Sequence, residues 1–308
     1  MTPRLIRMAR RPANQTLTGV LNALGCFSCW GLFPIYFKLL QQVPALEVVA
    51  HRICGSALIL LALIGLQGRW PALRSEFRDG RRLCFYLLTT LLISGNWLVY
   101  IWAVQQGRIL DASLGYYINP LVNVLLGVLF LHERLNPRQW LAVAFAGVGV
   151  LTLVIGHGVF PWIALTLAFS FGSYGMLRKR AGLDPALGLA VETLLLAPVA
   201  LLFLAALGGG ALGRIDRQID LLLLVAGLIT VAPLLMFLEA GQRLQLSTIG
   251  LIQYLTPTLQ FLLAVVVYHE RFTGVHLAVF GCIWLALALY SGDAWISHRH
   301  RLPAPHSP

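Results

Sequence analysis

The sequence predicts an all-α membrane protein of ten transmembrane helices, arranged as two inverted five-helix repeats. Hydrophobic residues make up 58% of the 308 residues and charged residues only 11%, whereas soluble proteins carry about 25% charged residues. Ten windows of mostly apolar residues are each long enough to cross roughly 30 Å of hydrocarbon at about 1.5 Å per residue. A motif that recurs in the second half of the chain predicts the repeat.

The ten apolar segments follow one another with short connections, and no connection is long enough to hold a soluble domain. The first segment follows a basic tail, lacks a small-x-small cleavage signal and carries Lys38 at its far end. We therefore interpret it as a retained helix rather than a signal peptide. In chain order the predicted helices cover residues 17–38, 47–66, 83–105, 112–132, 139–156, 160–178, 186–206, 219–241, 247–268 and 275–291.

The net charge of +11 is explained by membrane topology. Of the 23 Lys and Arg residues, 17 fall in the two terminal tails and in the loops after the second, fourth, sixth and eighth helices, and 4 fall in the opposite loops. Because positively charged loops stay on the cytoplasmic side, both termini are predicted to be cytoplasmic in a bacterial inner membrane. Since topology accounts for the basic charge, we expect no nucleic-acid partner.

The sequence shows no pattern typical of an enzyme, a cofactor site or a metal site. The Cys26-x-x-Cys29 pair has no second pair that would complete four zinc ligands. The chain contains no H-E-x-x-H, no G-x-S-x-G and no phosphate-binding loop. We expect no cofactor, no metal and no catalytic residues, and transport that is driven by gradients.

Two passages in the apolar segments share one unusual pattern. The run YYINPLVN, residues 116–123, is matched 137 residues later by QYLTPTLQ, residues 253–260. In both cases a His-Glu-Arg sequence follows the proline, with the glutamate thirteen residues after it. The tripeptide Pro-Ala-Leu also occurs twice, at residues 44–46 and 185–187, which places His51 opposite Glu192.

Five helices per half is an odd number, so the second half is expected to enter the membrane from the opposite side. Inverted repeats of this kind surround a shared polar site near the middle of the membrane. We predict a first repeat at residues 17–156, a second at residues 157–292, and cytoplasmic tails at residues 1–16 and 293–308.

The two halves resemble EamA domains, the five-helix repeat of the drug/metabolite transporter superfamily. The runs GVLNALGCFSCWGLFPIYFK, GNWLVYIWAV, ASLGYYINPLVNVLLGVLFLHER and IQYLTPTLQFLLAV carry this resemblance. The resemblance extends over residues 17–292 and implies a permease whose first four helices in each half surround a cavity, with the fifth outside it. It also marks Glu133 and Glu270 as signature positions, which we interpret as structural anchors.

Polar residues beside the two prolines form the candidate substrate site. Proline removes a backbone donor and frees carbonyl groups, which lipid tolerates only where protein or a watery cavity satisfies them. Asn119 and Asn123 lie on one helix face, as do Thr256 and Gln260; they either line a cavity or bind neighbouring helices together. The predicted cavity residues are Asn96, Trp97, Tyr117, Asn119, Pro120, Asn123, Tyr254, Thr256, Pro257 and Gln260.

Charged residues within apolar segments are costly, and their first interpretation is functional. His51 and Arg52 lie near the periplasmic end of the second helix, and Glu192 lies near the cytoplasmic end of the seventh. These three residues either gate the pathway, with His51 or Glu192 exchanging a proton with the cargo, or pair with other charges or extend to the headgroups at the membrane surface.

The sequence therefore predicts a secondary-active permease that exports small organic molecules by alternating access. A facilitative or uptake carrier, an intramembrane enzyme and a non-transporting sensor are the alternatives. The expected partners are a small-molecule substrate, the lipid bilayer and protons; Gly147 and Gly149 suit either internal packing or a homodimer contact.

Overall fold

The computed structural model describes residues 13–131, 137–157, 160–181, 184–244 and 252–300. Within these residues the chain forms helices and turns and no strand, and every predicted segment contains a helix. A π-helical turn at Leu263–Val267 follows α11. The helices are α1 (Ala13–Leu39), α2 (Ala45–Leu66), α3 (Trp70–Arg78), α4 (Gly80–Gln105), α5 (Ile109–Leu131), α6 (Pro137–His157), α7 (Trp162–Ala181), α8 (Pro185–Ala206), α9 (Arg217–Arg243), α11 (Leu255–Leu262) and α12 (Gly274–His300).

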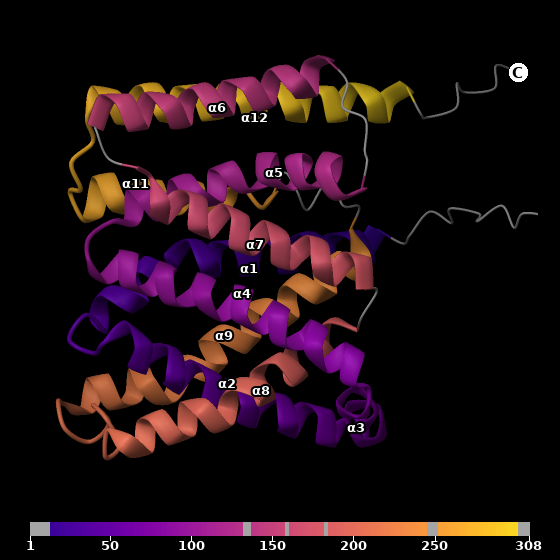
Figure 1. Ribbon diagram of the computed structural model, residues 1–308, viewed down its shortest axis with the longest axis vertical. Helices are drawn as coiled ribbons and strands as arrows, with labels where there is room; N and C mark the ends of the chain where they lie inside the picture. The colour runs from indigo at the N-terminus through magenta and orange to yellow at the C-terminus, as the bar shows by residue number, and fades with distance from the viewer. Residues whose placement is uncertain (1–12, 132–136, 158–159, 182–183, 245–251, 301–308) are drawn as a thin grey trace, which may run out of the picture.

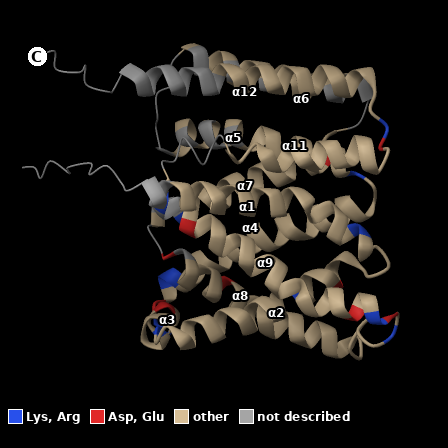
Figure 2. Ribbon diagram, turned by 180° about the vertical axis from the view of Figure 1, so that it is seen from behind, with Lys and Arg blue, Asp and Glu red and all other residues tan. Residues whose placement is uncertain are grey.

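The distribution of charge is that of a multi-pass membrane protein. Five of the described helices contain stretches long and apolar enough to cross a bilayer: α1, α2, α4, α8 and α9. Charged residues gather at the two ends of the helices, and a mostly uncharged band lies between them (Figure 2). Lipid can cover this band because the helices satisfy their own backbone hydrogen bonds.

The helices lie side by side, with α6 and α12 at one edge of the bundle and α2 and α8 towards the other (Figure 1). Helix α1 begins and α12 ends on the same side of the bundle (Figure 1). The α6 and α12 pair thus lies apart from the helices that carry Arg52 and Glu192.

Contacts between the two halves occur in matched pairs. Helix α1 packs against α9 and α11, while α7, which holds the same place in the second half, packs against α4 and α5. In the same way α2 packs against α9, and α8 packs against α4. Helices in equivalent places also meet each other, namely α2 with α8, α5 with α11 and α6 with α12. Each contact that a helix of one half makes with the other half is therefore matched by a contact between the equivalent helices.

Helix α3 was not predicted from the sequence. It is short and carries charged residues, so no apolar window marks it. Asp79 separates it from α4, because its carboxylate accepts the backbone N–H groups of Arg81 and Arg82 and caps α4.

The two proline motifs differ in their backbone. Helix α5 continues through position 120, whereas the chain turns at Gln253 and Tyr254 before α11 begins. Pro257 thus lies in the first turn of α11, where a missing N–H costs no helical hydrogen bond. The carbonyl of Gln253 accepts the N–H of Thr256 at 3.2 Å instead.

Candidate functional site

The polar residues of the two motifs join the halves through backbone carbonyls. Asn119 Nδ2 donates to the carbonyl of Ala168 on α7 at 3.0 Å, and Thr256 Oγ1 donates to the carbonyl of Phe27 on α1 at 2.8 Å. Both side chains are buried, so in this conformation they hold helices together. The side chains of Pro120 and Asn123, and Glu133 as a whole, lie outside the described residues.

Gln260 combines such a contact with an unused acceptor. Its Nε2 donates to the carbonyl of Trp30 at 3.2 Å and to the hydroxyl of Tyr100 at 3.0 Å. A carbonyl can only accept, which fixes the orientation of the amide. The buried Oε1 of Gln260 has no hydrogen-bond partner among the described residues. A buried acceptor without a donor is unfavourable, and it marks a position where a ligand group can bind.

Asn96 connects α4 with α5 and α7. Its Nδ2 donates to the carbonyl of Leu167 at 3.1 Å and to Ser170 Oγ at 2.9 Å. Its Oδ1 accepts the hydroxyl of Tyr116 at 3.3 Å. Asn96 is fully buried, and it links Tyr116 in the first half to α7 in the second.

A row of aromatic rings runs between the halves, and we call it the aromatic track. Successive ring centroids are 5.9, 5.7, 6.2 and 6.4 Å apart, distances at which aromatic rings attract one another. The rings come from α1, α4, α5 and α7 in turn. In order, they are Phe37, Tyr100, Tyr116, Phe171 and Tyr174.

Arg52 lies at one end of the aromatic track. Its Nε donates to Thr230 Oγ1 at 2.9 Å, and its guanidinium stacks over the rings of Trp97 and Phe37, 4.8 and 5.3 Å from their centroids. The residue is only 4% exposed. We call this region, near the beginning of α2, the Arg52 end.

The neighbouring residues of α2 contact the loop between α8 and α9. The carboxylate of Glu47 accepts the backbone N–H of Ala211 and lies 3.9 Å from Nε2 of His51. Gly210 has a φ of 66°, and a Cβ at this position would collide with the carboxylate of Glu47. The buried Nε2 of His51 has no hydrogen-bond partner in the described part of the chain.

Glu192 lies at the other end of the aromatic track, near the beginning of α8, and we call this region the Glu192 end. Its carboxylate accepts the hydroxyls of Thr89 at 2.6 Å and Tyr174 at 3.1 Å. Arg178 Nη1 lies 3.4 Å away and forms an ion pair with it. Gly188, one turn earlier, leaves room for this guanidinium, because a Cβ there would overlap it. Glu192 is 2% exposed.

A surface ion pair supports the Glu192 end. Arg69 Nη2 lies 2.7 Å from Asp184 Oδ2, and the carboxylate of Asp184 also caps α8 by accepting the N–H of Leu187 at 2.9 Å. Partial burial opposes ionisation, but the Leu187 amide and the Arg69 guanidinium together hold the pKa of Asp184 below its ordinary value.

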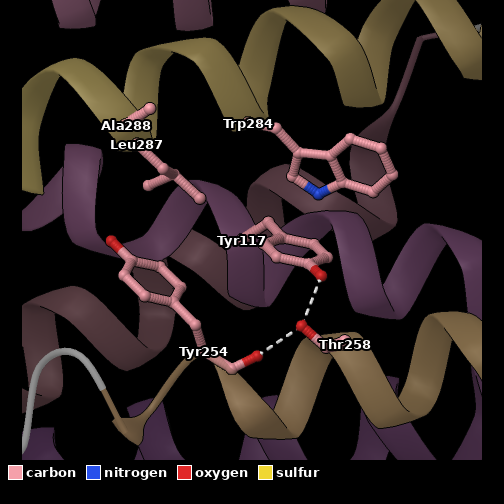
Figure 3. A pocket seen from close by; sticks show the side chains of 6 residues that line it. All are labelled: Tyr117, Tyr254, Thr258, Trp284, Leu287 and Ala288. Carbon is pink, nitrogen blue, oxygen red and sulfur yellow. Dashed lines mark hydrogen bonds between the residues drawn. The ribbon is translucent and has the colours of Figure 1, made fainter.

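Tyr117 and Tyr254 lie away from the aromatic track. Tyr117 faces α12, where its ring contacts Phe280 and Trp284, and its hydroxyl shares a 2.7 Å hydrogen bond with Thr258. Both tyrosines line a hollow of about 360 Å³ between α5, α11 and α12 (Figure 3). The hollow is lined by Tyr117, Tyr254, Thr258, Trp284, Leu287 and Ala288. The structure thus separates the predicted cavity residues into two groups.

Glu270 contacts the beginning of α5. Its two carboxylate oxygens accept the backbone N–H groups of Ile109 at 2.8 Å and Leu110 at 2.9 Å. Burial raises the pKa of Glu270, while these two amides and nearby Lys38 act in the opposite direction. The contact supports a structural role, and it connects the second half to the first.

Four residues of this region were not predicted from the sequence: Glu47, Arg178, Phe171 and Tyr174. Glu47 has a signal in the sequence, since a carboxylate four residues before His51 lies on the same helix face as that histidine. The others become neighbours of Glu192 or Tyr116 only through helix packing. Glu239, outside this region, is paired with Arg243.

Comparisons with known proteins agree with this architecture. The model of the EamA-like transporter family matches residues 17–155 and 161–292. An "Uncharacterized transporter" from Vibrio cholerae is 46% identical and aligns with 89% of this chain and 92% of its own length. "Protein RarD" from Escherichia coli K12 is 43% identical and aligns with 93% and 98%. A solved structure described only as "Crystal structure of protein" has a similar fold, with a TM-score of 0.60, 20% identity, and coverage of 92% of this chain and 99% of that one.

Proposed function

Because the chain belongs to the EamA-like transporter family, as a RarD-type member, we propose that it is a secondary-active permease that exports small organic metabolites or drugs. Ten helices would cross the bacterial inner membrane as two inverted repeats, with both termini in the cytoplasm. The Glu192 end would then face the cytoplasm and the Arg52 end the periplasm. The protein would act without a cofactor and without enzymatic chemistry.

The matched contacts between the halves support the inverted repeat. Each contact between the halves has a matching contact between the equivalent helices, as a pseudo-two-fold axis requires. A pair of inverted repeats can adopt two conformations of similar energy, one open to each side, and alternating access needs such a pair.

The aromatic track is the observation that carries the proposal. It lies between the halves and links two buried charged residues, Arg52 at one end and Glu192 at the other. His51, the neighbour of Arg52, occupies the repeat position equivalent to that of Glu192. Polar groups that a membrane protein buries in its bundle mark substrate pathways. Aromatic walls with a few polar groups suit amphipathic or aromatic cargo.

Few polar contacts hold each end of the aromatic track in this conformation. The Arg52 end is held by the bonds from Arg52 to Thr230 and from Ala211 to Glu47. The Glu192 end is held by the ion pair with Arg178 and two hydroxyl hydrogen bonds. Net contributions of about 1 kcal/mol for a neutral hydrogen bond and up to about 3 kcal/mol for a charged one allow each end to open on binding cargo or a proton. We propose His51, Arg52 and Glu192 as the gating residues, with Glu192 as the proton-coupling group.

The test is uptake into energised inverted membrane vesicles, with amino acids, aromatic metabolites and amphenicols as cargo. We expect accumulation above that of vesicles without the protein, and its loss in Glu192→Gln and Asn119→Ala with folding intact. Glu239→Gln is the matched control, because its carboxylate pairs with Arg243 four residues on and takes no part in the aromatic track. Transport that is unchanged by removal of the pH gradient would sink proton coupling. The absence of uptake of every cargo, under every imposed gradient, would sink the transporter proposal.

A further inference from the structure

Arg52 is a buried cation that pairs with no carboxylate in the part of the chain that the structure describes. Its Nε is bound to the neutral hydroxyl of Thr230, while Nη1 and Nη2 donate no hydrogen bond to any described residue. Among the described residues no carboxylate forms an ion pair with it. Lone buried charges of this kind are unfavourable, and native proteins rarely keep them unless a partner arrives.

The carboxylates of Glu47 and Glu192 are already bound to other groups. Glu47, on the same helix, binds the backbone of Ala211 and lies beside His51. Glu192 is bound to Arg178, Thr89 and Tyr174 at the other end of the aromatic track. The described residues thus supply no counter-ion in this conformation, and the aromatic faces of Trp97 and Phe37 compensate the charge only in part.

The neighbouring hydroxyls leave the guanidinium available. Tyr36 Oη donates to the carbonyl of Leu222 at 2.7 Å, and Tyr116 Oη donates to Asn96. Tyr100 Oη accepts from Gln260. All three hydroxyls lie within electrostatic reach of the Arg52 guanidinium, yet none accepts a hydrogen bond from it. The forked Nη donors match the two oxygens of a carboxylate.

We propose that Arg52 binds the carboxylate of a small organic acid whose planar apolar body packs against Trp97 at the Arg52 end of the aromatic track. This inference rests on the proposed transport function, because the acid would be the cargo. It assigns the cargo a negative charge, whereas the motif residues alone suggest neutral or zwitterionic cargo.

The first test compares acids with their uncharged amides on the purified native protein. The probes are benzoate, phenylacetate, cinnamate and indole-3-carboxylate, each with its carboxamide, and the measurement is binding by titration calorimetry. At least one acid should bind at least tenfold more tightly than its amide, since removing one partner of a charged hydrogen bond costs about tenfold or more. No saturable binding of any acid, or equal binding of acids and amides, would overturn the inference.

Three variants locate the site. Arg52→Gln should abolish the preference for acids, and Arg52→Lys should retain part of it, because lysine keeps the charge without the fork. Arg81→Gln, at an exposed arginine, should behave like the native protein. If Arg52→Gln fails to fold, Trp97→Leu replaces it, with weaker binding expected for acids and amides alike. A preference for acids that survives in a folded Arg52→Gln protein would overturn the assignment.

Uptake assays on the same samples separate the two proposals. Acid binding that depends on Arg52, without transport of any acid, would keep the binding site and remove the transport function. Transport of cargo by a protein whose acid binding does not depend on Arg52 would keep the transport function and remove the anion site.

Discussion

Replacement of Glu270 by alanine should destabilise the protein by about 2–4 kcal/mol. The first N–H groups of a helix have no partner within the helix, and at the beginning of α5 those of Ile109 and Leu110 are both bound by Glu270. Each hydrogen bond to a charged group contributes about 1.5–3 kcal/mol. Two such bonds would contribute about 3–6 kcal/mol. Burial of the carboxylate opposes its ionisation and raises its pKa, so desolvation offsets part of this gain and leaves about 2–4 kcal/mol.

Thermal unfolding in detergent, followed by intrinsic fluorescence, would measure the effect. One kcal/mol shifts Tm by about 2–4 °C in proteins somewhat smaller than this one, so Glu270→Ala should lower Tm by roughly 5–10 °C. Glu270→Gln should lower it by about half as much, since the amide oxygen can still accept one of the two N–H groups.

Glu239→Ala is the control. Its carboxylate pairs with Arg243 across one helix turn and is 40% exposed, and exposed pairs of this kind contribute at most about 1 kcal/mol. If Glu270→Ala and Glu239→Ala lower Tm equally, the contact between Glu270 and α5 has no special stabilising role, and the reasoning from the two hydrogen bonds is wrong.

Three further predictions concern the site. Gly188→Ala should displace Arg178 from Glu192 and lower transport several-fold at an unchanged amount of folded protein. Gly80→Ala, where a Cβ meets no neighbour, should leave transport unchanged. The pKa of Asp184 is lower in the folded protein than its unfolded value of about 3.9. Its ionised contacts therefore stabilise the protein fully above about pH 3.9, and this stability is lost as the pH falls through the folded pKa. In a Tm series between pH 6 and pH 3, Tm should thus fall less steeply for Asp184→Asn than for the native protein. Tyr116→Phe removes the hydroxyl that binds Asn96 and should change apparent cargo affinity several-fold in uptake assays, whereas Tyr117→Phe, which alters the hollow beside α12, should leave it within about twofold.

The positions of the helices followed from the sequence because apolar length is a local property. The predicted segment 83–105 lies within α4 (Gly80–Gln105), and the predicted segment 186–206 matches α8 (Pro185–Ala206). Helix α3 was missed for the same reason, since a nine-residue helix with several charges leaves no apolar signal.

The partners of the polar residues could not be derived in this way. Nothing in the motif around Pro257 says that Thr256 binds a carbonyl of α1 or that Ser113 Oγ donates to the carbonyl of Pro257, 144 residues away. The aromatic track has the same origin, because its rings come from four helices. Sequence periodicity identifies which face of a helix is apolar, but not which helix that face meets.

The two ends of the aromatic track differ chemically although they occupy equivalent repeat positions. With the 141-residue offset of the Pro-Ala-Leu motif, Arg52 corresponds to Thr193, and Glu47 corresponds to Gly188. The Arg52 end therefore holds a cation that no described carboxylate pairs with, while the Glu192 end holds a carboxylate that is already paired with Arg178. A bound organic anion would complete the charge pairing at the Arg52 end only, and a proton would remove the pairing at the Glu192 end only. Ligands that stabilise one conformation over another shift the equilibrium by that difference in affinity. In the proposed inverted repeat, the symmetry thus supplies two similar conformations, one open to each side of the membrane. The difference in charge between the Arg52 end and the Glu192 end determines which conformation the cargo favours and which the proton favours.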